Sequence, residues 1–286
     1  MLLIGVARAL GLLALPFEKV SRARVEKFAR RQSLPITADN GTPVICYLAT
    51  TRRWRGCGLL VSVALTVGIP LVGLIFWDSD TSGNLSVNVL ALFAGWFAGA
   101  VVAEWRVSVA AQLPGRRRAA VLEPRRLADY LLRPSRLVAV AAWVGLGFGE
   151  LSALGGLAAG HSRGLPVALL WIGLTALIGA VLITVGRQVL LRPQRDAAPD
   201  LIAADDALRS RSLHVLAGSS IAIAGYLLAA FVHALTPYST ILADGVGSLL
   251  GMIGVVLAPV LGFIVATSAV APIRRAHRPL VADSAR

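Results

Sequence analysis

Residues 165–186 read LPVALLWIGLTALIGAVLITVG and contain no charged side chain. A helix needs about 20 mostly apolar residues to cross the hydrocarbon core of a bilayer, which is about 30 Å thick. This run is long enough, and Arg163 and Arg187 lie just outside it. The sequence therefore predicts a transmembrane helix at 165–186.

The composition of the whole chain agrees with a membrane protein. Of the 286 residues, 56% are hydrophobic and 15% are charged, and the mean hydropathy is +0.73. Soluble domains are usually about 45–50% apolar and about 25% charged. These values exclude the disordered and collagenous classes, and two cysteines cannot form a disulfide framework.

Outward from 165–186, five further runs have the length and apolarity of a transmembrane helix. They lie at 57–77, 85–103, 137–160, 213–235 and 241–271. The predicted fold is all-α: a polytopic membrane protein with six transmembrane helices arranged as three hairpins. Small residues four positions apart allow close contact between such helices. They predict packing faces at Gly95/Gly99, Gly145/Gly149, Gly156/Gly160, Gly247/Gly251 and Ala258/Gly262.

The basic residues predict the orientation, because lysine and arginine are retained on the cytoplasmic side of short loops. Of the 28 lysines and arginines, 27 lie before the first run, after the last, or in the loops that follow runs two and four. Both termini are therefore expected in the cytoplasm. The basic residues are nearly all arginine, which is typical of GC-rich bacterial genomes, so we expect a bacterial plasma (inner) membrane.

Three regions follow from this topology. Residues 1–56 form a cytoplasmic or interfacial amphipathic segment, 57–271 the transmembrane domain, and 272–286 a basic cytoplasmic tail. Residues 1–15 are too short to span and carry Arg8, so we interpret them as interfacial rather than as a cleaved signal peptide. The net charge of +13 is spread over every cytoplasmic loop. It is therefore explained by lipid headgroups, and no nucleic-acid partner is expected.

A proline precedes an arginine by 12 positions three times, each time just before a predicted span: Pro43/Arg55, Pro124/Arg136 and Pro199/Arg211. Proline is well tolerated in the first turn of a helix, so we predict short cytoplasmic juxtamembrane helices at 43–55, 124–133 and 199–209. Equal spacing also arises by chance, so true triplication is one of two interpretations. The arginines expected to contact lipid headgroups or a partner are Arg52, Arg53, Arg55, Arg125, Arg126, Arg136, Arg209 and Arg211.

The sequence gives no basis for an enzyme. It lacks the G-x-S-x-G, H-E-x-x-H and G-x-x-x-x-G-K-[ST] motifs, and its four histidines are scattered singly. We therefore expect no catalytic residue, cofactor or metal site. A lipid-modifying enzyme ranks third among the functional hypotheses.

Glu150 is the most unusual residue of the predicted spans, because it lies near the middle of 137–160. An ionisable group at that depth is costly and must face the interior of the bundle. In the functional interpretation it binds a proton, a cation or a substrate. In the structural interpretation it accepts a hydrogen bond from a hydroxyl on a neighbouring span, such as Thr175 or Ser219.

A second candidate site lies at the expected outer surface. His233 ends one span and Asp244 begins the next, so the two side chains can meet, and His161 at another hairpin tip can join them. Such a cluster would respond to pH or touch a metal ion. The alternative is that these are ordinary solvated residues at hairpin ends.

Two functional hypotheses from different classes remain. In the first, the chain is a transport component, either a small permease or the membrane subunit of an exporter with a separate cytoplasmic ATPase. In the second, it is a non-catalytic scaffold or regulator that binds a partner through its inner-surface helices. Several spans lack polar residues, and a transporter of a hydrophilic substrate needs a polar path through the membrane. This lack therefore favours the scaffold over transport of a hydrophilic substrate. It does not count against transport of an apolar substrate, which needs no polar path. A homo-oligomer is compatible with either.

Overall fold

The computed structural model describes residues 19–76, 89–112, 125–160, 164–193, 198–238 and 245–268. Within these ranges every regular element is a helix. The elements are α2 (Arg22–Arg31), α3 (Ala38–Phe76), α4 (Val89–Gln112), η1 (Leu127–Asp129), α5 (Arg133–Gly160), α6 (Leu165–Leu191), α7 (Pro199–Leu235), η3 (Thr236–Tyr238), α9 (Val246–Met252), η4 (Ile253–Leu257) and α10 (Ala258–Thr267). The predicted interfacial segment 1–15 and tail 272–286 lie outside the described residues.

Four of these helical stretches are long and apolar enough to cross a membrane: Arg133–Leu157, Leu165–Leu191, Pro199–Tyr238 and Val246–Thr267. They cover most of the last four predicted spans, although the spans predicted at 137–160 and 241–271 extend beyond them. The first two predicted spans fall in α3 and α4, which do not meet the same criteria over their described residues. The all-helical prediction is therefore confirmed for the described part of the chain, and four of its helices could cross a membrane. The number of six spans and their arrangement as three hairpins stay predictions.

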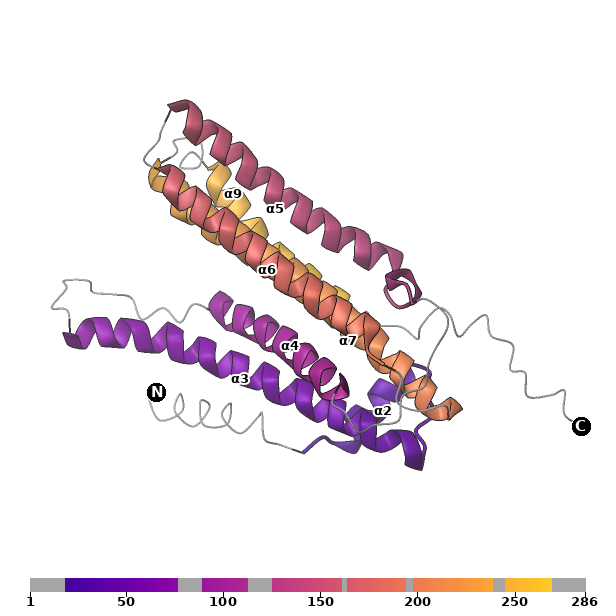
Figure 1. Cartoon of the computed structure of the whole chain (residues 1–286). Coiled ribbons are helices and arrows are strands. Elements are labelled where there is room, and N and C mark those ends of the chain that lie inside the picture. The colour runs from indigo at the N-terminus through magenta and orange to yellow at the C-terminus, as the bar shows by residue number, and fades with distance from the viewer. Residues whose placement is uncertain are drawn as a thin grey trace, which may run out of the picture.

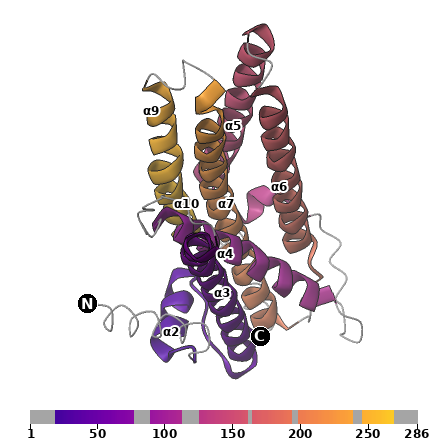
Figure 2. The same cartoon turned by 90° about the vertical axis from the view of Figure 1, so that its left-hand side faces the viewer.

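Helix α7 is the centre of the fold (Figures 1 and 2). In its most apolar stretch 67% of the residues are buried, against 11% for the corresponding stretches of α5 and α6. Helix α10 packs along α7 on one side, and α5, α6, α4 and α3 also contact it. The core is therefore built around one helix rather than around three equivalent hairpins.

Glycine lets α10 approach α7 closely. A Cβ added to Gly218 would overlap the carbonyl oxygen of Gly262, and one added to Gly225 would overlap Ala258. Without side chains at these points the two backbones come into direct contact, which is the packing mode expected between helices in lipid. The predicted face at Ala258/Gly262 is confirmed.

Helices α3 and α4 form a second close pair. A Cβ on Gly58 would overlap the carbonyl oxygen of Gly95, and one on Gly99 would overlap that of Trp54. The predicted face at Gly95/Gly99 is therefore confirmed as well. Its partner, Gly58, lies at the start of the first predicted span.

Helices α5 and α6 pack differently. A Cβ on Gly145, Gly155 or Gly156 of α5, or on Gly173 or Gly186 of α6, would meet no atom within 4 Å. Helix α5 contacts α7 more extensively than it contacts α6. At the predicted Gly145/Gly149 face, a Cβ on Gly149 would lie 3.7 Å from Leu228 of α7, an ordinary contact, whereas one on Gly145 would meet no atom within 4 Å. This face is therefore not a close backbone crossing like those of Gly218 and Gly58.

The juxtamembrane segments also differ from the prediction. Residues 43–55 and 199–209 are helical, but each is continuous with the following span as part of α3 or α7. In the second segment, 124–133, the described residues form only the single turn η1 and a short irregular stretch before α5. The apolar residues of the first and third segments face each other rather than a lipid surface, which removes the reason for a separate surface helix.

Candidate functional site

A groove bounded by α5, α6 and α7 lies among the apolar helices. It has a volume of about 500 Å³, and its lining includes Leu131, Trp143, Gly179, Leu182, Gly186 and Leu216. The lining is almost entirely hydrocarbon, so the groove is suited to an acyl chain or another apolar group.

Two arginines lie at one end of this groove. Arg136 is in the first turn of α5, Arg187 lies four residues before the end of α6 at Leu191, and both line the cavity. The two helices run in opposite directions, so the start of α5 and the end of α6 lie on the same side (Figure 1). We define the α5–α6 groove as this apolar cavity with Arg136 and Arg187 at its end. Its shape and charge fit an apolar molecule with an anionic head.

The rims of the α5–α6 groove are exposed and apolar. On α5, Val140 and Val144 are 55% and 64% exposed, and Ile183 on α6 is 64% exposed. Large exposed apolar patches of this kind mark contact with membrane lipid or another apolar partner. The groove therefore opens sideways from the helices rather than along their axes.

A cluster of buried ion pairs, which we call the ionic clasp, joins the end of α6 to α7. The Asp205 carboxylate accepts a hydrogen bond from Arg192 at 2.7 Å and another from Arg209 at 2.7 Å. The Arg192 and Arg209 side chains are 4% and 0% exposed. Arg209 also donates to the backbone carbonyl of Arg192 at 2.9 Å, and Arg125 donates to the same oxygen at 2.9 Å.

Tyr130 connects η1 to the same part of α7. Its hydroxyl donates to Asp206 at 3.1 Å, its ring lies 5.7 Å from the Arg209 guanidinium, and its carbonyl accepts from Ser210 at 3.0 Å. Burial, and secondly the charge of Asp206, raises the pKa of the Tyr130 phenol, so it remains a donor. Together these bonds fix the entrance to α5 against α7.

A second buried polar cluster joins α3, α4 and α7. The Tyr47 hydroxyl donates to Glu104 Oε1 at 2.9 Å, and Ser212 donates to the Tyr47 hydroxyl at 3.4 Å. Glu104 is fully buried. Burial, followed by the charge of Glu104, raises the pKa of Tyr47, which keeps the phenol protonated. We interpret this cluster as the polar contact that orients α3 and α4 on α7.

The arginines predicted to contact headgroups or a partner separate into three groups by burial. Arg53 and Arg126 are exposed; Arg52, Arg55, Arg125, Arg136 and Arg211 are half-buried; Arg209 is fully buried. The structure corrects the expectation for Arg209, since its guanidinium faces Asp205 and the end of α6 instead of a surface. Its spacing of four from Asp205 on one helix is the signal that would have revealed this ion pair.

Glu150 faces the bundle interior and is 4% exposed. Thr175 of α6 donates a hydrogen bond to Glu150 Oε1 at 2.6 Å. This is the bond named in the structural interpretation of Glu150, and it is confirmed. The proton- or substrate-binding interpretation stays a prediction.

The predicted outer cluster is described only in part. His233 is exposed near the end of α7. Asp244 and His161 lie outside the described residues, so their meeting with His233 stays a prediction. Among the residues that the structure does describe, no group of three His, Cys, Asp or Glu side chains is arranged to hold a metal ion.

Sequence reasoning did not predict the place of several residues of these clusters, among them Glu104, Arg187, Arg192, Asp205 and Tyr130. Glu104 and Arg187 directly follow predicted spans, where charged residues are ordinary and carry little signal.

Comparison of the chain with protein-family models, with curated proteins and with solved structures gave no match. The function is therefore argued from the geometry alone.

Proposed function

We propose that the chain is a membrane transport component that binds an anionic amphiphile in the α5–α6 groove. It acts either as a small permease or as the membrane subunit of an exporter with a separate ATPase. The observation that supports this proposal is the lateral apolar groove with Arg136 and Arg187 at one end. A fatty acid or a single-chain phospholipid has the matching chemistry, a hydrocarbon chain with one anionic head.

An apolar substrate fits this chain better than a hydrophilic one. A hydrophilic substrate needs a path of polar side chains through the membrane. In α5 and α6 the carboxyl of Glu150 is engaged with Thr175, and the surface that α5 and α6 present sideways is hydrocarbon. An amphiphile enters such a groove from the lipid, with its head at the arginines.

The packing of the inner segments bears on every hypothesis that needs a docked partner. A scaffold, and equally an exporter subunit with a separate ATPase, would bind its partner through the inner-surface helices. In the structure Val44 and Tyr47 pack against Ala204, Ala207 and Leu208. These apolar faces are used within the chain, which favours the small permease among the forms considered.

The proposal includes the full topology: six spans in three hairpins in a bacterial plasma membrane, with both termini cytoplasmic. Reporter fusions test it. Fusions after Ser82 and Thr236 should be external, and those after Arg118 and Arg195 should be cytoplasmic. A reversed pair would contradict the topology without bearing on the groove.

Binding is tested by filling the groove. The position of Gly186 lines it, and an added Cβ there meets open space, so Gly186→Leu introduces a side chain without a clash. Gly173→Leu on the same helix is the matched control, since it also meets open space but lies outside the groove lining. The probe is fluorescent lysophosphatidylglycerol, with lysophosphatidylcholine as the zwitterionic comparison, in neutral detergent.

We expect Gly186→Leu to weaken lysophosphatidylglycerol binding about tenfold, a loss of about 1.4 kcal/mol, and Gly173→Leu to leave it unchanged. Equal binding by the wild type and both variants would contradict the groove assignment.

A transport assay in vesicles that contain the chain distinguishes a small permease from the membrane subunit of an exporter. A permease moves the probe across the bilayer by itself, whereas an exporter subunit requires its co-purified ATPase and ATP.

A further inference from the structure

A second cavity, distinct from the α5–α6 groove, lies between α2, α3, α4 and α7. It has a volume of about 380 Å³ and shares no lining residue with the groove. Its basic lining residues are Arg24, Lys27, Arg31, Arg52, Arg55 and Arg211. We define these six residues with the space they surround as the cationic pocket.

The cationic pocket has a strong charge imbalance. No aspartate or glutamate is among its lining residues in the described part of the chain. Glu104, behind the lining residue Tyr47, interacts with Arg55 and Arg211 from outside the pocket, and one carboxyl balances at most one of the six charges. The other like charges around this small space repel each other unless an anion lies between them. A ligand with one or more phosphate groups would supply that charge and accept charge-assisted hydrogen bonds from several arginines.

Two of the cations, Arg55 and Arg211, are positioned by contacts with neighbouring residues. Arg55 lies over the Trp96 ring at 4.9 Å, and its Nε atom is buried without a hydrogen-bond partner. Arg211 donates to the carbonyl of Ala266. Both guanidiniums are therefore positioned by the fold rather than extended freely into solvent.

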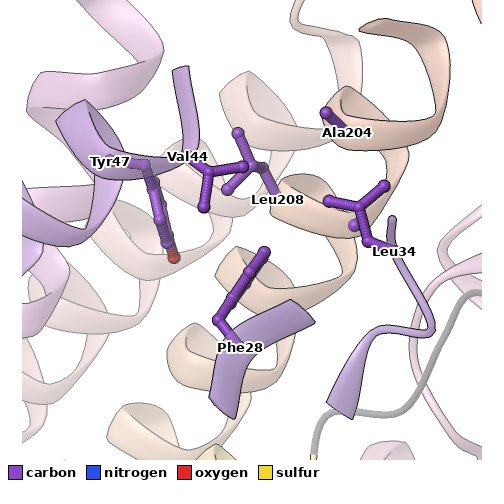
Figure 3. Packing of buried hydrophobic residues seen from close by; sticks show 7 residues of the cluster. Phe28, Leu34, Val44, Tyr47, Ala204 and Leu208 are labelled. Carbon is purple, nitrogen blue, oxygen red and sulfur yellow. The ribbon is translucent and has the colours of Figure 1, made fainter. Parts of the chain in front are cut away.

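Helix α2 closes one side of the pocket and is anchored to the body of the protein. Phe28 from α2 and Leu34 just after it are buried against Val44, Tyr47 and Leu208, as Figure 3 shows. This contact fixes the face of α2 that carries Arg24, Lys27 and Arg31. The three cations are thus brought beside those of α3 and α7 by packing.

Most of the remaining lining residues are apolar or aromatic, among them Leu48, Leu59 and Trp96, and two are uncharged polar residues, Gln32 and Thr51. Leu59 and Trp96 belong to the first two predicted spans, whereas the α2 cations precede them. Tryptophan is enriched at the level of lipid headgroups. A ligand with a phosphate at the cations and hydrocarbon along Leu59 and Trp96 matches both parts of the lining.

We infer that the cationic pocket binds the phosphate headgroup of an anionic phospholipid and holds it between α2 and the start of the spans. The site is separate from the substrate groove proposed above. A bound lipid there would neutralise the six cations and stabilise α2 on α3. The same phosphate chemistry could come from a free phosphate compound, and the experiment separates the two sources.

The test compares two double variants on α2. Arg24→Gln with Arg31→Gln removes two pocket cations, while Arg22→Gln with Arg30→Gln removes two exposed cations of the same helix that do not line the pocket. The change in net charge is identical. Native mass spectrometry of the protein in neutral detergent measures binding of phosphatidylglycerol and phosphatidylcholine to each form.

We expect the wild type to bind one phosphatidylglycerol about tenfold more tightly than phosphatidylcholine. The pocket double variant should lose about 25-fold in phosphatidylglycerol affinity, since each of the two basic residues near an anionic lipid contributes about fivefold. The control double variant should lose less than twofold. Equal losses in the two double variants would overturn the pocket and indicate a non-specific charge effect.

Inorganic phosphate, added at constant ionic strength, identifies the source. If the pocket is a lipid site, millimolar phosphate should not displace phosphatidylglycerol from the wild type. Displacement by phosphate, with no preference for phosphatidylglycerol over phosphatidylcholine, would overturn the lipid assignment. Because Gly186→Leu leaves the cationic pocket intact, failure in the groove and failure here are distinguishable.

Discussion

The pair α7–α10 and the pair α5–α6 contain similar glycine-rich apolar sequences but pack in opposite ways. Between α7 and α10, Gly218 meets the backbone of Gly262 directly, whereas Gly173 and Gly186 of α6 meet open space. Two helices approach closely only where small residues face each other on both, and α5 places no small residue against Gly173 or Gly186 of α6. A glycine in an apolar helix can therefore mark either a close helix crossing or an open groove.

The largest effect is expected where the loosely packed α6 is fastened to α7. Asp205→Asn removes the carboxylate that pairs with the buried Arg192 and Arg209. Leaving buried charges without their partner typically costs about 3–5 kcal/mol. We expect a marked fall in the thermal unfolding midpoint in detergent. A midpoint unchanged from the wild type would show that the clasp does not hold α6 in place.

The next effect compares the two kinds of glycine. Gly218→Leu forces a side chain into the backbone of α10 and should destabilise the fold by about 1–3 kcal/mol or prevent assembly. Gly173→Leu should have little effect, because its position is open. Thermal unfolding and the monodisperse fraction after solubilisation measure both. If the two variants behave alike, the contrast between the helix pairs is wrong.

A smaller effect is expected at the hydrogen bond that joins α5 to α6. Glu150→Ala removes the acceptor for Thr175 and leaves a cavity, at a cost of about 1–3 kcal/mol. Glu150→Gln keeps a carbonyl acceptor and should cost about 0.5 kcal/mol or less. Unfolding of the two variants provides the comparison.

Transport by the same glutamine variant distinguishes the two interpretations of Glu150. If the carboxyl serves only structure, Glu150→Gln should move the labelled lysophosphatidylglycerol at the wild-type rate. A well-folded but inactive Glu150→Gln protein would instead show that a titratable proton takes part in transport.

Much of the helical architecture could be predicted from apolar run length alone, because about 20 uncharged residues have few alternatives to a spanning helix. The Glu150–Thr175 bond was also predictable, since a carboxyl at mid-span must find a hydroxyl or another partner within the bundle. Both inferences depend on local sequence and a single physical cost. They did not require knowledge of how the helices are arranged.

The arrangement itself could not be predicted in this way. Pro199 indicated the start of α7 correctly, whereas α3 begins five residues before Pro43, at Ala38. Nothing local showed that these helices continue into the spans and pack against each other. The groove depends on the distance between α5 and α6, and the cationic pocket on α2 folding back through Phe28. Such contacts join residues far apart in the sequence, so composition and spacing carry little information about them.

The most direct test of the proposed function is to map where an anionic amphiphile touches the wild-type chain. A lysophosphatidylglycerol with a photoreactive acyl chain would be crosslinked in vesicles and the labelled peptides identified by mass spectrometry. The proposal predicts labels on α5 and α6 near Trp143, Leu182 and Gly186, reduced by excess unlabelled lysophosphatidylglycerol and absent in Gly186→Leu. Uniform labelling of every lipid-exposed helix, unchanged by competitor, would contradict it.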